Sequence, residues 1–341
     1  MTTNPAADVP PQAQLFQLGA GGAVSKAIGI IAELGVADFL AKGESSTADL
    51  AGACGAQPLA LERVLRLLAT VDVVRSAGPG RYALGPLGQL LRSDSPTSMR
   101  SMMRMITGPL MRGIAQAEIS VRTGRPAFDE VLGAPFFEYL AAHEDDGLVF
   151  SEAMTDLGRS FNMAVLDAYD FSGITTLVDV GAGHGWLVSS VLQKYPVMRG
   201  ILFDQPHIAE IGRKTLAEAD LLDRCEAVGG DFFAEVPAGG DAYILSWIIH
   251  DWDEPRALTL LENCRRAMGP DGLLLLCEFV LPEGNEPHLG KVLDFWIMSC
   301  LEGRERTEAE YRDLLARAGF TLERVVPSAT PMCVIEARPT R

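Results

Sequence analysis

The chain is poor in aromatic residues and in positive charge. Aromatic residues make up 7% of it, and 29 lysines and arginines stand against 45 aspartates and glutamates, which gives a formal net charge of −16. A surface this acidic repels the phosphates of nucleic acids and anionic membranes. We therefore expect neither nucleic acid nor a membrane among its partners.

Paired cysteines and long apolar runs are also lacking. The six cysteines are scattered, with no Cys-x-x-Cys pair and no ligand-like spacing to histidine, in a chain of 341 residues. That pattern is typical of reduced thiols and predicts no metal site. No apolar run approaches the roughly 20 residues of a membrane span, and the polar start MTTNPAADVPPQ is unlike a signal peptide. We expect a cytoplasmic protein with a disordered N-terminus over residues 1–12.

What is present over residues 13–98 is a mostly helical pattern followed by a ribbon. The stretch AVSKAIGIIAELGVADFL has apolar residues at helical spacing, and a shorter helix capped by Ser46 or Thr47 ends at Gly55. Pro58 opens the next helix, and a Gly/Pro turn in RSAGPGRYALGPLG separates two short strands. Helix, turn, helix and ribbon describe a winged helix.

Two functions compete for this winged-helix-like segment. A DNA-reading helix would carry a row of basic residues, but here Arg63 and Arg66 stand beside Glu62 in an acidic protein. Long apolar helix faces suit helix-on-helix packing between two copies of a chain better. We favour a dimerisation domain and expect a homodimer.

A second helical stretch over residues 99–165 is rich in methionine. Most of these methionines are expected to fill a core at helical spacing. Others could line a pocket for a flat ligand, because methionine adapts its shape to what it packs against. The better pocket candidates are Phe136, Phe137, Phe150 and Met154.

Over residues 166–341 short apolar runs alternate with helical patterns. The runs TTLVDV, GILFD, CEAVGG, AYILSW and GLLLLCEFV are apolar almost throughout, as strands buried on both faces must be. FTLERVVPS and PMCVIEARP follow as two strands, which we expect to form a hairpin at the sheet edge. This alternation predicts an α/β fold with a Rossmann-like, doubly wound sheet.

The first of these strands runs directly into a glycine loop, DVGAGHGWL. In such a sheet that turn is where a ligand lies, against backbone N–H groups and a helix N-terminus. The glycines alternate as G-x-G-x-G, unlike the G-x-G-x-x-G of dinucleotide-binding loops, which disfavours a nicotinamide dehydrogenase. Asp179, just before Gly181, would repel phosphate and suits a ligand with an ammonium or sulfonium group.

Further acids stand at the ends of the next strands. Asp204 ends the second strand, about 20 residues beyond Gly183, where a carboxylate can hold ribose hydroxyls. Asp231 and Phe232 follow the third strand and could accept a hydrogen bond from an adenine amine and pack on its ring. Together these residues predict one nucleoside-binding slot.

His250 follows the fourth strand, at the same expected sheet edge. Glu278 ends the apolar fifth strand, an unusual place for a charge without a partner, and Glu305 lies in a turn before a helix capped by Thr307. Taken singly, each has an ordinary interpretation: a histidine of the core or the surface, a glutamate paired with an arginine, and a solvated glutamate.

At this point the chain resembles the class I S-adenosylmethionine-dependent small-molecule O-methyltransferases, of the plant caffeate and bacterial polyketide type. The resemblance covers nearly the whole chain and rests on LVDVGAGHG, GILFDQPH, GGDFF, HDW at 250–252, CE at 277–278 and GRERT. It implies S-adenosylmethionine as cofactor, S-adenosylhomocysteine as product and a small aromatic or polyketide acceptor.

The resemblance also implies roles for individual residues. His250 matches the general base, and Glu278 and Glu305 match the carboxylates that orient it. Cofactor contacts are implied for Gly181, Gly183, Asp204, Gln205, Gly230, Asp231, Phe232, Ser246 and Trp247, and acceptor contacts for Phe150, Met154, Trp296 and Ile297. Two positions depart from the family pattern: Ser246 stands where plant members typically have lysine, and Ile297 where many relatives have methionine.

The chemistry of O-methylation gives the histidine a task, because the acceptor hydroxyl must lose a proton. Transfer from a phenol of pKa near 10 to a histidine near 6.5 is uphill by about 3.5 units, or roughly 5 kcal/mol. A carboxylate on the other ring nitrogen reduces this deficit. The alternatives are the same fold with C-methylation, hydroxylation or decarboxylation, and a ligand-sensing regulator that uses the winged helix. Asp251 is expected to cap or pair structurally.

Overall fold

The structure is a computed structural model that describes residues 9–340, without the side chains of residues 159 and 160. The chain divides into two compact units, one of residues 1–111 with 143–156 and the other of residues 112–142 with 157–341. The disorder predicted for residues 1–12 lies mainly outside the described residues. Within them, the first helix already begins at Pro11, so the prediction is wrong for residues 11 and 12.

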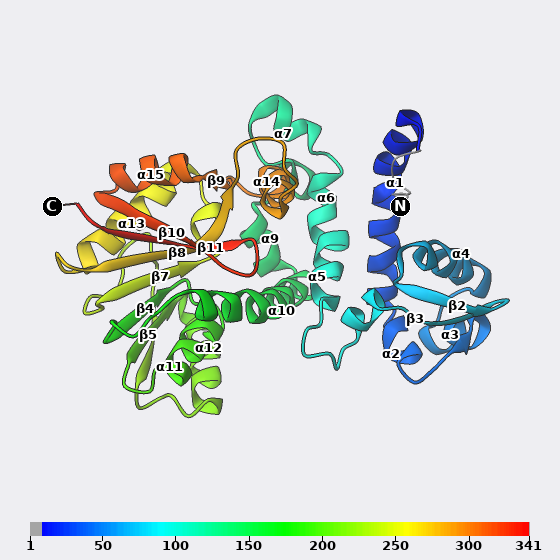
Figure 1. Cartoon of the computed structure of the whole chain (residues 1–341), viewed down its shortest axis with the longest axis horizontal. Helices are drawn as coiled ribbons and strands as arrows, with labels where there is room; N and C mark the ends of the chain where they lie inside the picture. The colour runs from blue at the N-terminus through cyan, green and yellow to red at the C-terminus, as the bar shows by residue number, and fades with distance from the viewer. Residues whose placement is uncertain (1–8, 341) are drawn as a thin grey trace, which may run out of the picture. The chain divides into compact units, whose positions relative to one another are not determined.

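The first unit is built from helices and one small sheet (Figure 1). Its sheet has the strand order β1-β3-β2, and Ser46 caps α3 by accepting a hydrogen bond from the Asp49 amide. Gly55 ends α3 in the left-handed region, and Pro58 opens α4, as the sequence predicted. Its elements are α1 (Pro11–Glu33), α2 (Val36–Leu40), β1 (Ser45–Ser46), α3 (Thr47–Cys54), α4 (Pro58–Leu68), η2 (Ala69–Val71), β2 (Val74–Gly78), β3 (Arg81–Leu84), η3 (Leu87–Leu91), α5 (Arg100–Met105), η4 (Ile106–Leu110) and the first half of α10 (Glu144–Ala168).

Helix α1 presents large apolar side chains to solvent near its start. Leu15, Phe16 and Leu18 are each more than 70% exposed, whereas Ile31 near its end is fully buried in the core of the unit. By length and composition α1 is also long and apolar enough to cross a membrane, which the sequence analysis did not expect. A core helix of a water-soluble protein, or a signal sequence near the N-terminus, can have the same length and composition.

The second unit holds the large sheet, drawn in Figure 1 with its covering helices. This second unit includes α14, a helix that the sequence did not predict. Its elements are α6 (Met111–Ile114), α7 (Glu118–Thr123), α8 (Ala127–Leu132), α9 (Phe136–Ala142), the second half of α10, β4 (Thr176–Val180), α11 (Trp186–Lys194), β5 (Arg199–Asp204), α12 (Pro206–Glu218), β6 (Cys225–Gly229), β7 (Ala242–Ser246), η5 (Ile249–Asp251), α13 (Glu254–Ala267), β8 (Leu273–Leu281), α14 (Leu289–Cys300), β9 (Arg306–Thr307), α15 (Glu308–Arg317), β10 (Phe320–Pro327) and β11 (Met332–Pro339).

The strand order of this sheet fixes where a ligand site belongs. Among the described residues the main path runs β10-β11-β8-β7-β4-β5-β6, with β9 paired to β8. Strands β4 to β8 pair in parallel, and β10 and β11 form the antiparallel edge hairpin that the sequence predicted. The chain winds from β4 toward β6 and then returns through β7 to β8, so the direction switches between β4 and β7. Ligands of doubly wound sheets bind at such a point, beyond the carboxyl ends of the strands.

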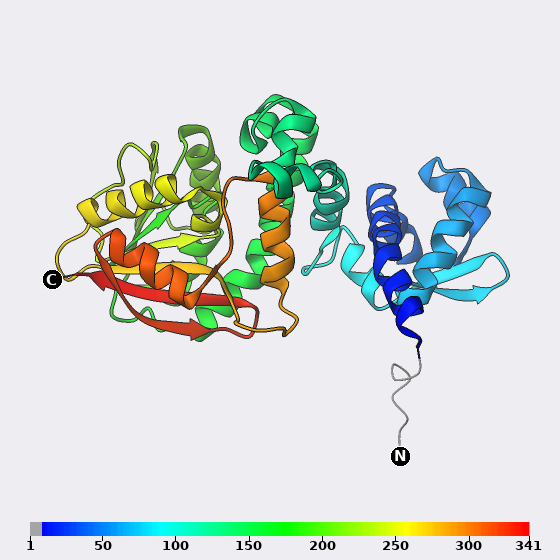
Figure 2. The same cartoon turned by 90° about the horizontal axis from the view of Figure 1, so that it is seen from above.

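Helices cover both faces of the sheet, which explains why its strands are apolar throughout (Figures 1 and 2). On one face α11, α12 and the end of α10 pack over Leu177, Leu202 and Ile244. On the other face α13 and α15 pack over the alternate residues, such as Val178 and Tyr243. The α/β, Rossmann-like fold predicted from the sequence is confirmed.

Candidate active site

The glycine loop follows β4 and depends on backbone conformations that favour glycine. Gly181, Gly183 and Gly185 all have positive φ, at 74°, 56° and 77°. The amide of Gly181 donates to the Phe203 carbonyl at 2.8 Å, which ties the loop to the end of the neighbouring strand β5. The loop is therefore held with its backbone at the switch point of the sheet.

Asp179 lies beneath this loop. It is 1% exposed, and its Oδ2 accepts a hydrogen bond from the Val188 amide in α11 at 3.2 Å. Burial raises its pKa to about 7, against the opposing effect of that hydrogen bond. In the structure Asp179 thus anchors helix α11 to strand β4.

Asp204 at the end of β5 holds the loop from the other side. Its Oδ2 accepts from the Gly183 amide and its Oδ1 from the Gln205 amide, each at 2.7 Å. Burial raises the pKa of this carboxyl, and the two hydrogen bonds oppose the shift. Each oxygen keeps a lone pair beyond these bonds, which suits it to accept from vicinal hydroxyls of a ribose.

The residues after β6 lie against the same place. The Gly230 amide donates to the Asp204 carbonyl at 2.9 Å, and Asp231 is exposed, with its Oδ1 accepting from the Phe233 amide. A Cβ built on Gly181 would lie 3.7 Å from the ring of Phe232. The structure therefore brings the glycine loop, Asp204 and Phe232 together.

Ser246 is the last residue of β7, and Trp247 follows it. Because β7 pairs with β4 in parallel, both lie next to the end of β4 that leads into the glycine loop. Trp247 has a left-handed backbone, with φ of 60°, which is unusual for a bulky residue and is typical of strained functional sites. The Ser246 hydroxyl and the Trp247 indole N–H are buried and have no hydrogen-bond partner among the residues that the structure describes. Unpaired polar atoms beside a bare glycine backbone fit a polar, nucleoside-containing cofactor at this edge.

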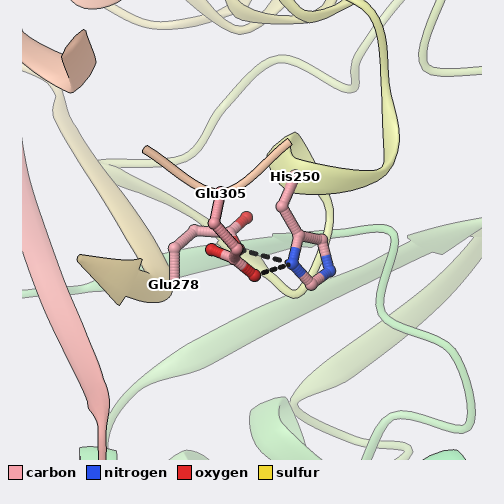
Figure 3. Close-up of side chains that lie close together, drawn as sticks. All are labelled: His250, Glu278 and Glu305. Atoms are coloured by element: carbon pink, nitrogen blue, oxygen red, sulfur yellow. Dashed lines mark hydrogen bonds and ion pairs between the residues drawn. The ribbon is translucent and has the colours of Figure 1, made fainter. Parts of the chain in front are cut away.

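His250 lies in η5, the single turn that follows β7, and so comes after the strand as the sequence predicted. Its side chain is 5% exposed, and it meets two buried glutamates from segments far along the chain (Figure 3). Nδ1 lies 2.7 Å from Glu305 Oε1, a hydrogen bond, and 3.6 Å from Glu278 Oε2. The three residues that the sequence predicted to act together do come together.

Glu278 also fixes the turn that carries His250. Its Oε1 accepts from the amides of Ile248 and Ile249, at 3.1 and 2.8 Å, so the buried carboxylate holds the backbone just before the histidine. Among the side chains that the structure describes, no arginine pairs with Glu278, which corrects the alternative of a glutamate paired with an arginine. Burial raises the pKa of Glu278 to about 7, while His250 opposes that shift.

Asp251 approaches the ring from its other side. Its Oδ1 lies 3.4 Å from His250 Nε2, whereas the cap of the following helix α13 is Asp253. Burial by itself lowers the pKa of His250, but the charges of Glu278, Glu305 and Asp251 outweigh it and raise that pKa to about 10. The imidazole therefore binds a proton far more tightly than a free histidine does.

By distance alone, His250, Glu278 and Glu305 could also hold a metal ion, since their ligand atoms lie within 4.8 Å of one another. The observed 2.7 Å between Nδ1 and Oε1 is a hydrogen-bond length. Ligands of a tetrahedral zinc ion stand about 3.3 Å apart, given metal–ligand bonds of about 2 Å. The cluster as it stands is arranged to share protons.

The predicted acceptor-binding residues are divided between the two units. Phe150 and Met154 lie half-buried on α10 in the first unit. Trp296 is half-buried and Ile297 is 3% exposed, both on α14 in the second unit. Their role in binding an acceptor stays a prediction.

Three residues that the sequence did not indicate lie around the cluster of His250, Glu278 and Glu305. Asp294 Oδ1 accepts from the Glu305 amide at 2.9 Å, and Gly303 and Arg306 flank that glutamate in contact with the His250 turn. The motif GRERT contains two of them, but nothing in its letters shows which backbone they meet.

Comparison with known proteins gives the family. A model described as the O-methyltransferase domain matches residues 115–321, and one described as the O-methyltransferase dimerisation domain matches residues 16–94. The chain is similar to the phenazine O-methyltransferase PhzM of Lysobacter antibioticus, with 46% identity over 98% of each chain.

Two further relatives are named for different acceptor atoms. The 3-amino-4-hydroxybenzoate 4-O-methyltransferase of Streptomyces cremeus is 41% identical, over 92% of this chain and 86% of the relative. The 8-amino-8-demethylriboflavin N,N-dimethyltransferase of Streptomyces davaonensis is 38% identical, over 96% of this chain and 95% of the relative.

Solved structures agree with this placement. The mitomycin 7-O-methyltransferase MmcR is similar with a TM-score of 0.90 and 34% identity, over 96% of this chain and 98% of that one. The neocarzinostatin O-methyltransferase NcsB1, solved with S-adenosylmethionine and 2-hydroxy-5-methyl naphthoic acid, is similar with a TM-score of 0.82 and 29% identity, over 99% of each chain. The chain therefore belongs to the O-methyltransferase family, and its cofactor is S-adenosylmethionine.

Proposed function

We propose that this protein methylates a hydroxyl group of a small aromatic or polyketide-type molecule, with His250 as general base. The observation that carries this proposal is the 2.7 Å hydrogen bond between His250 Nδ1 and Glu305 Oε1 inside a buried carboxylate cluster. A carboxylate on Nδ1 holds the tautomer in which Nε2 can take the acceptor proton.

The cluster changes the energetics expected for an isolated histidine. Because the charges around it raise the pKa of His250 to about 10, proton transfer from a phenol, whose pKa is also about 10, is close to balanced. When bound, S-adenosylmethionine supplies a methyl group that a sulfonium centre makes electrophilic. The task of the protein is then to position the oxygen and take its proton.

We assign the cofactor site to the sheet edge around the glycine loop. Gly181 and Gly183 lie against the methionine part, and Asp204, with Gln205, binds the ribose hydroxyls. Gly230, Asp231 and Phe232, with Ser246 and Trp247, surround the adenine. The amides of Gly183 and Gln205 donate hydrogen bonds to the Asp204 carboxylate. These bonds support the assignment, because they hold the carboxylate beside the glycine loop.

The domain organisation follows from the same proposal. Residues 13–98 form a dimerisation domain, and we infer a cytoplasmic homodimer in which residues 166–341 bind the cofactor. For residues 99–165 we propose that Phe150 and Met154 contact the acceptor. For the catalytic domain we propose the same role for Trp296 and Ile297. The exposed apolar side chains at the start of α1 suit a surface that a second copy covers.

N-methylation is the second candidate, favoured by one observation. A relative with 38% identity over nearly the whole chain is named an amine dimethyltransferase. A neutral amine attacks without first losing a proton, so it does not need a base before methyl transfer. The buried His250–Glu305 pair favours the hydroxyl acceptor, which does need one.

A first experiment tests the cofactor site without a known acceptor. S-adenosylmethionine, S-adenosylhomocysteine and NAD are titrated separately by calorimetry into the wild type and Asp204→Ala. We expect micromolar binding of the first two in the wild type and its loss in the variant. Binding of NAD alone, or of none of the three, would overturn the assignment of the slot.

A second experiment tests the base. A panel of a hydroxyphenazine, 3-amino-4-hydroxybenzoate and a hydroxynaphthoate, with their amino counterparts, is screened for methyl transfer. His250→Ala should lower turnover of the accepted hydroxyl compound by about 10²–10⁴ and leave cofactor binding intact. Turnover near the wild-type rate in His250→Ala, or methylation of the amino counterparts alone, would contradict the proposal.

A further inference from the structure

The segment 303–306 lies directly against the turn that carries His250. A Cβ built on Gly303 would lie 1.9 Å from the His250 carbonyl oxygen and 2.6 Å from the Trp252 amide nitrogen. These are backbone atoms, which have no rotamer by which to move aside. Only a glycine lets the chain pass this close, two residues before Glu305.

The buried side chain of Arg306 forms hydrogen bonds to both of these segments, 303–306 and the turn that carries His250. Its Nη1 donates to the Ile249 carbonyl at 3.3 Å and to the Arg304 carbonyl at 3.1 Å. Those carbonyls belong to the residues immediately before His250 and Glu305. With its two hydrogens, Nη1 of Arg306 thus links the backbone before His250 to the backbone before Glu305. These are the two residues that the Nδ1–Oε1 hydrogen bond joins.

The position of Arg306 is hard to explain by stability alone. Its side chain is 1% exposed, yet its Nε and Nη2 have no hydrogen-bond partner within the described part of the chain. It lies over the ring of Tyr311, 5.9 Å from the ring centroid, rather than in an ion pair. A buried, incompletely paired charge costs free energy compared with an apolar side chain, so a role in fixing geometry accounts for it better.

We propose that Arg306 is a positioning residue which, with the close approach at Gly303, sets the separation of His250 from Glu305. The pairing of Arg306 with Val280, two residues beyond Glu278, attaches the same segment to the strand that carries the other glutamate. This proposal rests on the proposed function, because it gives Arg306 a purpose only through His250.

The first test observes the histidine without requiring turnover. Protein labelled with ¹⁵N-histidine has only five histidines, and the ring signals of His250 are identified by their loss in His250→Ala. The variants are Arg306→Met, Arg306→Lys and Gly303→Ala. We expect all three to move the His250 ring signals and its titration toward those of Glu305→Gln.

The structure offers matched controls. Arg224 also donates to backbone carbonyls, those of Met198 and Leu192, but it precedes β6 at the opposite end of the sheet. A Cβ built on Gly269 would meet nothing within 4 Å. Arg224→Met and Gly269→Ala should therefore leave the His250 signals unchanged, whatever their effect on the melting temperature.

The second test uses kinetics with the accepted substrate. Arg306→Met should lower kcat by about 10²-fold, as expected for a misplacement near 1 Å, and leave the Kd of S-adenosylmethionine unchanged. Arg306→Lys keeps the charge but not the paired donors of Nη1, so it should also lower kcat.

The outcomes separate this proposal from the proposed function. Unchanged His250 signals and an unchanged pH profile in folded Arg306→Lys or Gly303→Ala would overturn the positioning role, even if His250→Ala is inactive. Normal turnover in His250→Ala would overturn the base assignment, while the ring signals would still report whether Arg306 sets the His250–Glu305 contact.

Discussion

The side chains of His250 and Asp251, neighbours in sequence, turn toward each other, with Nε2 3.4 Å from Oδ1. The nitrogen that we propose to accept the substrate proton therefore faces a carboxylate, while the other nitrogen is hydrogen-bonded to Glu305. With a pKa raised to about 10 by these charges, His250 is mostly protonated at neutral pH. The fraction of enzyme with a free base then grows as the pH rises.

Asp251→Asn should shift the pH dependence of turnover downward. Removing a negative charge beside Nε2 destabilises the imidazolium, so the pKa of His250 falls from about 10 toward its usual value. The acid limb of the kcat profile moves to lower pH, and the plateau falls because the base is weaker. Turnover measured from pH 6 to pH 11 checks this. Asp271→Asn, the same charge change at an exposed site, is the control, and identical limbs in both variants would contradict the prediction.

Asp179→Asn should stabilise the protein at alkaline pH and not at acid pH. Burial raises the pKa of Asp179 to about 7, from 3.8 in the unfolded chain. Because the folded pKa is the higher one, its contribution to the free energy of unfolding is greatest below about pH 4 and is lost as the pH rises through 7. The loss amounts to roughly 1.4 kcal/mol for each unit, or up to about 4 kcal/mol.

Denaturant unfolding of the wild type and Asp179→Asn at pH 4 and pH 8 measures this difference. Asparagine keeps an oxygen that can accept from the Val188 amide, so the hydrogen bond to α11 is retained. An equal difference between the two proteins at both pH values would show that the carboxyl is not held in its protonated form by burial.

Alanine at Gly183 and at Gly185 should have different consequences. Both residues have positive φ, which costs an alanine about 1–2 kcal/mol. A Cβ at Gly185 would also lie 2.4 Å from Leu202 Cδ1 in the core, whereas one at Gly183 would meet nothing within 4 Å. We expect Gly185→Ala to lose more stability, by about a further 1–3 kcal/mol.

Affinity should show the reverse order. If the cofactor lies against the bare backbone at Gly183, the methyl group of Gly183→Ala meets it directly and weakens binding of S-adenosylmethionine more than Gly185→Ala does. Calorimetry and thermal unfolding on the two variants measure both effects. Weaker binding in Gly185→Ala alone would place the cofactor elsewhere along the loop.

The doubly wound sheet, the edge hairpin and the sheet edge that carries the candidate site could be predicted from the amino-acid pattern alone. These follow from local rules, because strands buried on both faces are apolar throughout and parallel strands end at one edge. The glycine spacing and the acids at the strand ends could also be recognised in the sequence, because they too are local patterns at the ends of predicted strands. The helix α14 was not assigned, since an apolar run next to a turn does not by its pattern distinguish a helix from a strand.

Which polar groups meet could not be predicted from the sequence, because it depends on the packing of the folded chain. Asp179 anchors a helix, Asp251 turns toward Nε2, and Arg306 connects segments that lie 57 residues apart in sequence, from Arg306 to Ile249. The direction of a side chain and the backbone that it meets depend on how distant segments pack. The raised pKa of His250 likewise comes from Glu278 and Glu305, which folding and burial bring to the ring.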